Sequence, residues 1–333
     1  MRAIQGRWLL ATATALTLTA CGGVGGTTNI ASTPVPPPSP PPAPPPPPDP
    51  IPIKIFPTPT IGQYASVGAS ISGPGGNLDT YSSATERFGT ISTDPADQAH
   101  IRYTAGGFYE VQLAGANWDR LVPYELMVDP HPDNNYFQPA SVQANYGYVL
   151  TSNSRNNGYT YSEIASWGSS AQHRRGYFAF GVATPVGGVP TSGSATFQGA
   201  AYGSTDIMIA DNLYGGYYPL PTDGTVTLNF DFGAGSLAGR MDLFLPDGMN
   251  PIPLTSFAFQ QTVFSAGSTT YSGTFGTSAT GQNFFLGQLT GPNAEETIGA
   301  WAVPFVFDHN GSTIAGDGQT HHAFGAWIAK PGP

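Results

Sequence analysis

The 333-residue chain carries 11 Lys and Arg against 21 Asp and Glu, and its formal net charge at pH 7 is −10. This acidic balance argues against nucleic acid as a partner, because nucleic acid needs a basic face. Only 10% of the residues are charged, 12% are aromatic and 43 are glycine, a composition typical of an antiparallel β protein with many turns. The single cysteine excludes a disulfide within the chain.

The first twenty residues have the pattern of a secretory signal peptide. Arg2 and Arg7 form a basic start, and residues 8–20 are apolar or hydroxylic with no charge. This stretch is shorter than the roughly 20 apolar residues that a membrane-spanning helix needs. We therefore expect residues 1–20 to be a signal peptide that is removed.

The only cysteine follows this segment directly. Leu18-Thr19-Ala20-Cys21 resembles the lipobox of bacterial lipoproteins. The resemblance implies cleavage before Cys21 and acylation of the new N-terminus, with the Cys21 thiol taking a lipid. Gly22 stands where an aspartate is associated with retention in the inner membrane, so an outer-membrane location is implied, facing the cell surface or the periplasm. A buried cysteine behind an ordinary signal peptide is the alternative.

A glycine- and proline-rich spacer is expected over residues 21–60. Residues 34–59 hold 16 of the 33 prolines. Because proline fixes φ and lacks an N–H, this run is expected to adopt extended polyproline II. At about 3.1 Å per residue, roughly 25 residues hold the rest of the chain about 75–80 Å beyond the lipid anchor. A ligand for an SH3-type domain is the alternative interpretation.

Residues 181–333 show the clearest alternation of apolar and polar side chains. Residues 225–232 and 236–245 each alternate with a period of two and are joined by a short glycine-rich turn, which predicts a hairpin. Asp223-Gly224 and Asp317-Gly318 are typical turn dipeptides. Together with six more segments, these predict an eight-stranded antiparallel up-and-down β-barrel with a filled interior. The six further segments are 194–203, 255–264, 269–276, 282–291, 297–307 and 321–329.

Residues 61–180 are less regular and predict a smaller β-rich, handle-like subdomain before the barrel. Short β runs are expected at residues 100–113 and 146–153. The expected fold class of the whole chain is therefore all-β.

Three segments resemble the barrel of transferrin-binding-protein-B-type lipoproteins. They are FFLGQLTGPNAEETIGAW (284–301), HHAFGAWIAK (321–330) and YFAFGVATPVGGVPTSGSATFQGAAYG (177–203). They share with that family a strand ending in Gly-Pro before a small residue and Glu, a last strand ending in Phe-Gly-Ala, and a Pro-Thr-Ser-Gly link at the barrel entry. The family's Gly-Phe-Tyr-Gly-Pro motif and double glycine are replaced here by residues 287–292 and the single Gly299. The resemblance covers residues 177–330 and implies one lobe of handle and barrel.

For function, the resemblance implies a lipoprotein that binds a ligand through barrel and handle loops and is not an enzyme. The expected partners are the membrane, through the lipid anchor, and a host or environmental iron-carrier protein or haem. A TonB-type outer-membrane receptor is a further expected partner. No cofactor is expected, and haem or iron is the alternative that stays open. A structural envelope lipoprotein without a soluble ligand is the alternative.

Three polar clusters invite a chemical interpretation. Adjacent residues of a strand point to opposite faces, so Glu295 and Glu296 cannot flank one substrate, and His321 and His322 are separated in the same way. Residues 128–139 are rich in oxygen ligands but lack the central glycine and distal glutamate of an EF-hand loop. We therefore expect no catalytic residue and no metal ligand among them.

Three tyrosines form the candidate ligand-binding set. Tyr214, Tyr217 and Tyr218 lie in the segment NLYGGYYPLP (212–221), which we expect to be a loop between strands. Tyrosine in loops supplies a large contact area at low entropic cost. The alternative is that these rings cover one end of the barrel.

Overall fold

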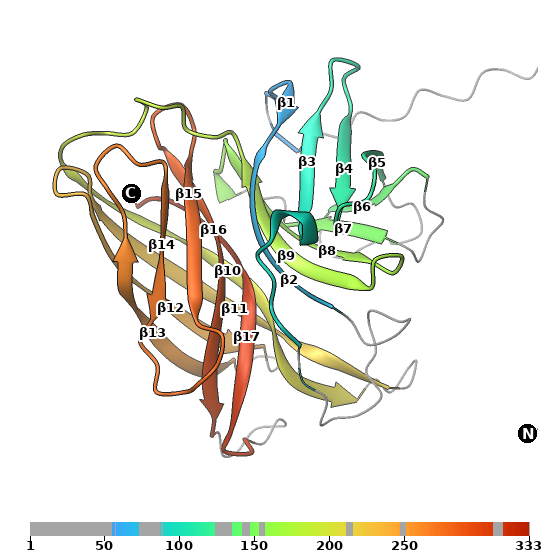
Figure 1. Cartoon of the computed structure of the whole chain (residues 1–333), viewed down its shortest axis with the longest axis vertical. Helices are drawn as coiled ribbons and strands as arrows, with labels where there is room; N and C mark the ends of the chain where they lie inside the picture. Colours follow the sequence, from blue (N-terminus) through green and yellow to red (C-terminus); the bar gives the residue numbers. More distant parts are fainter. Residues whose placement is uncertain are drawn as a thin grey trace, which may run out of the picture. The chain divides into compact units, whose positions relative to one another are not determined.

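The alternating segments of the C-terminal half form a closed barrel in the computed structural model (Figure 1). The structure describes residues 55–56, 58–72, 87, 89–123, 135–141, 147–152, 157–210, 216–246, 251–308 and 316–332. All of them belong to one unit, Pro50–Pro333. Cys21, Tyr214 and most of the expected spacer lie outside the described residues.

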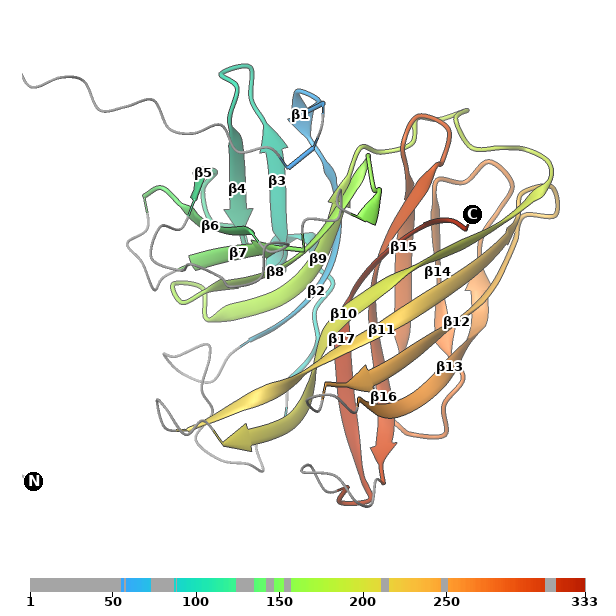
Figure 2. The same cartoon turned by 180° about the vertical axis from the view of Figure 1, so that it is seen from behind.

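The barrel consists of eight antiparallel strands in sequence order, and β17 closes it by pairing with β10. Figure 2 shows β10 to β13 side by side in the wall. The predicted eight-stranded up-and-down barrel is confirmed. The strands are β10 (Ser194–Ala210), β11 (Tyr217–Asp231), β12 (Ser236–Leu245), β13 (Ile252–Val263), β14 (Thr270–Phe275), β15 (Phe284–Thr290), β16 (Glu296–Phe307) and β17 (Gln319–Pro331).

Aromatic rings packed over glycines fill the barrel interior. Val226, Leu228 and Phe230 of β11 point inward, as their alternation predicts, while the residues between them face outward. The buried Trp327 ring lies against Gly299, where an added Cβ would come within 2.3 Å of it. A side chain at this position would displace the ring. The glycine therefore makes room for the tryptophan on the neighbouring strand.

One of the two turn dipeptides does not turn. Asp223 and Gly224 lie inside β11 and pair with Phe244 and Leu243 of β12. The turn prediction is wrong there because Gly224 allows the backbones of β11 and β12 to come close together. An added Cβ at this position would lie 2.4 Å from the carbonyl oxygen of Asp242. Asp317-Gly318, by contrast, does turn, with Gly318 at a φ of +67° immediately before β17.

The residues before the barrel form a nine-stranded antiparallel sheet, blue to green in Figure 1, ordered β1-β3-β4-β5-β6-β7-β8-β9-β2. The runs predicted at 100–113 and 146–153 correspond to β3, β4 and β7. One short stretch of chain supplies both edges, because β1 pairs with β3 and the next strand, β2, pairs with β9, so the sheet nearly closes on itself. The elements are β1 (Gly62–Gln63), β2 (Ala65–Ser72), a 3₁₀ turn η1 (Pro95–Asp97), β3 (Ala99–Tyr103), β4 (Tyr109–Leu113), β5 (Asp119–Pro123), β6 (Asn135–Pro139), β7 (Gly147–Thr151), β8 (Ser162–Ser169) and β9 (Arg174–Gly181).

The sheet has its own hydrophobic core, which includes residues from the expected spacer. Ile55 and Phe56 are only 5% and 3% exposed, and the Phe56 backbone N–H donates to the Tyr109 hydroxyl at 3.3 Å. The stretch that the sequence assigns to the spacer thus already takes part in the fold at residue 55. Burial of these two apolar side chains stabilises the attachment of the chain by about 3–6 kcal/mol in hydrophobic free energy, before conformational entropy is counted.

A third core joins the sheet to the outer wall of the barrel. Ala69, Ile71 and Ala179 of the sheet pack with Ile298 and Ala300 of β16. Both faces of β16 are consequently buried along almost its whole length. Within the described ranges, no helix has the length and hydropathy that crossing a bilayer requires.

Candidate functional site

Two of the three candidate tyrosines lie on a strand, not in a loop. Tyr217 and Tyr218 begin β11, where they pair with Ala210 and Ile209 of β10. The predicted loop setting is therefore wrong for them, because tyrosine has a high β propensity and both residues find partners on β10 despite the neighbouring glycines and prolines. Tyr218 is 38% exposed and Tyr217 is half-buried. Their role in ligand binding stays a prediction, as does that of Tyr214.

A row of three charged side chains crosses the face of the sheet that points away from its core. The strand register pairs Arg102 on β3 with Glu110 on β4, and Glu110 with Arg120 on β5. The Arg102 guanidinium forms an ion pair with the Glu110 carboxylate. Two guanidinium groups against one carboxylate leave this row locally positive in a chain whose net charge is −10. We call the row the arginine ladder.

Aromatic rings hold both arginines of the ladder. The Arg102 guanidinium lies 4.4 Å from the centre of the Trp118 ring, and that of Arg120 lies 4.9 Å from the centre of the Phe108 ring. All four side chains are half-buried. Cation–π contacts of this kind restrict a guanidinium while leaving its N–H donors available. Tryptophan and arginine are also the residues that most often dominate protein–protein interfaces.

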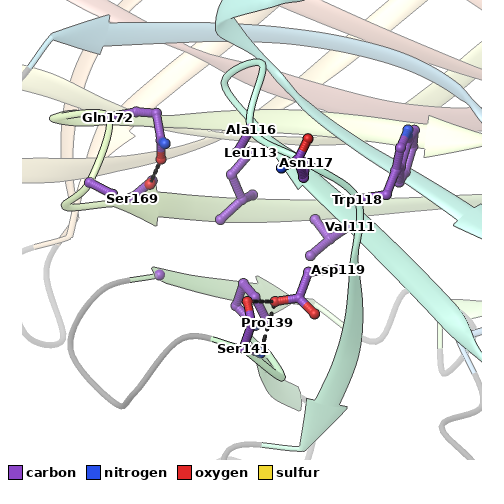
Figure 3. Close-up of a pocket in the computed structure, with 12 residues that line it drawn as sticks. Val111, Leu113, Ala116, Asn117, Trp118, Asp119, Pro139, Ser141, Ser169 and Gln172 are labelled. Atoms are coloured by element: carbon purple, nitrogen blue, oxygen red, sulfur yellow. Dashed lines mark hydrogen bonds between the residues drawn. The ribbon is translucent and has the colours of Figure 1, made fainter.

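A pocket of about 370 Å³ adjoins the same strands (Figure 3), where Val111 and Asp119 alternate with Glu110 and Arg120 of the ladder and therefore point to the opposite face. Its apolar lining comes from Val111, Leu113 and Pro139, and Trp118 also contributes. Polar side chains surround these residues. They are Asn117, Asp119, Ser141, Ser169 and Gln172. The pocket therefore combines an apolar surface with several hydrogen-bonding groups, as small-molecule sites commonly do.

A buried histidine lies between two carboxylates at one end of the barrel. The His321 imidazole is hydrogen-bonded through Nδ1 to Asp206 at 2.9 Å and through Nε2 to Asp317 at 3.0 Å. Asp206 is fully buried and also accepts the backbone N–H of His322 at 3.0 Å. His321 is buried and His322 half-buried, as expected for successive residues of a strand. Asp206 is 115 residues away in sequence and was not predicted from spacing.

The surroundings of His321 favour its charged form. Burial alone would lower the pKa of His321, but the hydrogen bonds and charges of Asp206 and Asp317 outweigh it and raise that pKa. Burial alone would raise the pKa of Asp206, but the hydrogen bonds from His321 and His322 outweigh it and hold that pKa below the ordinary value. Because ionised carboxylate oxygens only accept hydrogen bonds, both ring nitrogens donate when Asp206 and Asp317 are charged, and both pKa shifts favour this charged arrangement. Among the described residues, no group of three or more His, Cys, Asp and Glu could hold a metal ion.

The paired glutamates have separate structural roles. The buried Glu296 carboxylate accepts backbone N–H groups of Thr160 at 2.6 Å and Tyr161 at 3.1 Å, which links the start of β16 to the segment before β8. Burial raises the pKa of Glu296, and these hydrogen bonds only partly oppose the rise. Glu295 instead accepts from the backbone and side-chain amides of Asn293, both at 2.8 Å. The two carboxylates therefore do not face one substrate.

Comparisons with known proteins report on the fold. No protein-family model and no curated protein matches the chain. Similar solved structures include transferrin-binding protein B from Haemophilus parasuis, at 15% identity and a TM-score of 0.41, covering 80% of this chain and 44% of that one. Transferrin-binding protein B from serogroup B Neisseria meningitidis gives 14% identity, a TM-score of 0.37 and coverage of 80% and 43%. HpuA from Kingella denitrificans, solved with human haemoglobin, gives 12% identity, a TM-score of 0.33 and coverage of 82% and 88%.

These similarities concern architecture alone. This chain spans less than half the length of the two transferrin-binding proteins. Both are named transferrin-binding protein B, the family whose barrel segments the sequence resembles. The order predicted from that resemblance, a β-rich region followed by an eight-stranded barrel, is the order found in this chain.

Proposed function

We propose that the chain is an outer-membrane lipoprotein that binds an iron-carrier protein and catalyses no reaction. The observation that carries the proposal is the arginine ladder: two guanidinium groups, each set against an aromatic ring, on the exposed face of β3 to β5. Such groups are already restricted before a partner arrives, so little side-chain entropy is lost on binding. Their bidentate N–H donors suit carboxylates on a partner's surface.

The same proposal assigns roles to further residues, of which Tyr217 and Tyr218 lie inside the described part of the chain and Cys21 and Tyr214 outside it. Cys21 carries the lipid, and the proline-rich stretch holds the folded region away from the membrane. Tyr214, Tyr217 and Tyr218 provide a second contact region, and a TonB-type receptor would receive the iron. No cofactor is part of the proposal. Recovery of the chain in the outer-membrane fraction, and its loss from that fraction in Cys21→Ala, would support the anchor.

Transferrin and haemoglobin are the first ligands to test, since the fold neighbours are named for binding the one or were solved with the other. Surface plasmon resonance would measure each protein over the immobilised Cys21→Ala chain, which lacks the acylated thiol. We expect one of them to bind, and Arg102→Ala/Arg120→Ala to weaken that binding by about tenfold or more, as interface arginines commonly do.

Arg240→Ala is the matched control, because Arg240 is an exposed arginine on the barrel that pairs with Asp242. It should bind like the parent chain. An equal loss in the control would show that the effect is not specific to the ladder. If neither protein binds, the proposed ligand class is wrong and the structural envelope role becomes the better account.

A further inference from the structure

We propose that the pocket lined by Val111, Leu113 and Asp119 binds a saccharide ring. This inference goes beyond the proposed function and does not depend on it, because the pocket residues used below are not part of the ladder. It rests on three features of the pocket: an apolar surface, hydrogen-bonding groups with unused capacity around it, and the charge of its lining.

The apolar surface suits the C–H faces of a sugar. Val111 and Leu113 lie centrally in Figure 3, between Asp119 and Ser141 on one side and Ser169 and Gln172 on the other. They are only 1% and 5% exposed and form the floor of the pocket, and the half-buried Trp118 is the larger accessible apolar side chain of its lining. A pyranose ring has two such faces of C–H bonds, which gain contact with aliphatic and aromatic side chains when water leaves. At about 370 Å³ the pocket lies at the small end of the size range of small-molecule sites.

The polar groups retain hydrogen-bonding capacity at separate points. One oxygen of Asp119, Oδ2, accepts the Ser141 backbone N–H at 2.9 Å, and within the described part of the chain its Oδ1 has no partner. The Ser169 hydroxyl donates to Gln172 Oε1, which orients the amide and leaves its Nε2 as a donor. Asn117 is exposed and offers both a donor and an acceptor. Because each sugar hydroxyl donates and accepts, an acceptor, a donor and a mixed amide around an apolar surface complement adjacent hydroxyls.

The charge of the lining disfavours other small ligands. The described residues that line the pocket include no Lys, Arg or His, so nothing there neutralises a phosphate or a carboxylate. Asp119 is the one carboxylate among these lining residues, and it is already hydrogen-bonded. A single carboxylate supplies too few ligands to bind a cation. A neutral ligand rich in hydroxyls is the class that remains.

Saturation-transfer NMR on the full Cys21→Ala chain tests the inference with three free sugars: maltose, lactose and N-acetylglucosamine. We expect transfer to the ring protons of at least one. Asn117→Ala/Gln172→Ala should weaken that sugar's affinity by about tenfold, since the variant removes two side-chain hydrogen-bond partners and leaves the apolar surface intact.

Asn229→Ala is the control, because Asn229 is an exposed amide on the outer face of β11. It should bind the sugar like the parent chain. Absence of transfer to all three sugars overturns the inference. So does binding that the Asn117→Ala/Gln172→Ala variant leaves unchanged. Arg102→Ala/Arg120→Ala should retain sugar binding, so failure here and failure of the proposed function are separate results.

Discussion

The barrel and the nine-stranded sheet are both built from antiparallel strands, but they differ in strand length, in closure and in the side chains that they display. The barrel strands are 6 to 17 residues long and leave no free edge, because β17 returns to β10. Five consecutive strands of the sheet, β3 to β7, have only five residues each. Buried rings occupy the interior of the barrel, whereas the sheet displays arginine, tryptophan and a pocket on or beside its short strands.

This difference indicates a division of roles. Closure and aromatic packing give the barrel a stable framework, and the sheet is fastened to it through β2, β9 and β16. The short strands β3 to β5 carry half-buried polar groups whose replacement should cost little stability. We therefore expect core variants of the barrel to affect folding and ladder variants of the sheet to affect binding.

The largest effect on stability should come from the barrel interior. Trp327→Ala removes a fully buried ring that stacks on Phe259 and donates to the Tyr271 hydroxyl at 3.2 Å, and it should cost about 3–5 kcal/mol in the free energy of unfolding. Trp118→Ala removes the half-buried ring under Arg102 and should cost about 1 kcal/mol, the order of a cation–π contact near the surface. Urea unfolding followed by circular dichroism measures both. Equal losses would contradict the division of roles.

The next largest effect should be dependent on pH. A raised folded-state pKa means that His321 contributes its stability fully below its ordinary pKa of 6.5 and loses it as the pH rises through the folded value. Asp206 has a lowered pKa, so its contribution is present above 3.8 and is lost as the pH falls through the folded value. His321→Gln should therefore cost about 3 kcal/mol at about pH 5.5, and less as the pH rises through the folded-state pKa of His321.

Unfolding of the parent chain and of His321→Gln at several pH values tests this. Two further charged or titratable groups lie at this end of the barrel: Arg87, 3.8 Å from Asp317, and His322, which lies near Asp206. His322→Gln is therefore the control for a general change of charge there. A destabilisation by His321→Gln that is the same at every pH would show that the imidazole packs there as a neutral group.

A smaller effect should appear at the junction between sheet and barrel. Glu296→Ala leaves the backbone N–H groups of Thr160 and Tyr161 without their acceptor and should cost about 1–3 kcal/mol. Glu295→Ala loses only an exposed contact with Asn293 and should cost about 0.5 kcal/mol or less. Thermal unfolding compares the two. Similar melting temperatures for both variants would mean that Glu296 does not fasten the sheet.

The smallest effect on stability should come from the ladder. Arg102→Ala breaks a partly exposed ion pair with Glu110 and should cost about 1 kcal/mol or less. The same unfolding assay should place it close to Arg240→Ala. A loss as large as that of Trp327→Ala would mean that the ladder is structural, and that weakened ligand binding in this variant reflects unfolding.

The regular alternation of apolar and polar residues made the barrel predictable, whereas a dipeptide typical of turns was misleading. The period of two in β11 and β12 reports which side chains face the interior, and closure follows from eight such strands. Asp223-Gly224 failed as a turn because a glycine needed for close strand contact is indistinguishable, in one sequence, from a glycine needed for a turn. The strands β2 and β8 were missed because they are buried on both faces over most of their length and do not alternate clearly.

The sites were less predictable because they depend on register and on distant pairing. The ladder could have been found: residues 100–113 read as a hairpin, and a turn after Tyr103 places Arg102 opposite Glu110. Arg120 and Trp118, however, follow a second turn. The spacing of residues in the sequence does not determine the register of the strand after that turn. The pairing of His321 with Asp206 required the barrel to close, which brings β17 beside β10.

Hydrogen–deuterium exchange with and without the iron-carrier protein is the most direct test of where the chain binds. If the ladder is the binding face, the protein ligand should protect backbone amides of residues 99–123 and leave those of residues 226–245 in the barrel unchanged. Protection confined to the barrel end that holds Tyr217 and Tyr218, with residues 99–123 unaffected, would contradict the account.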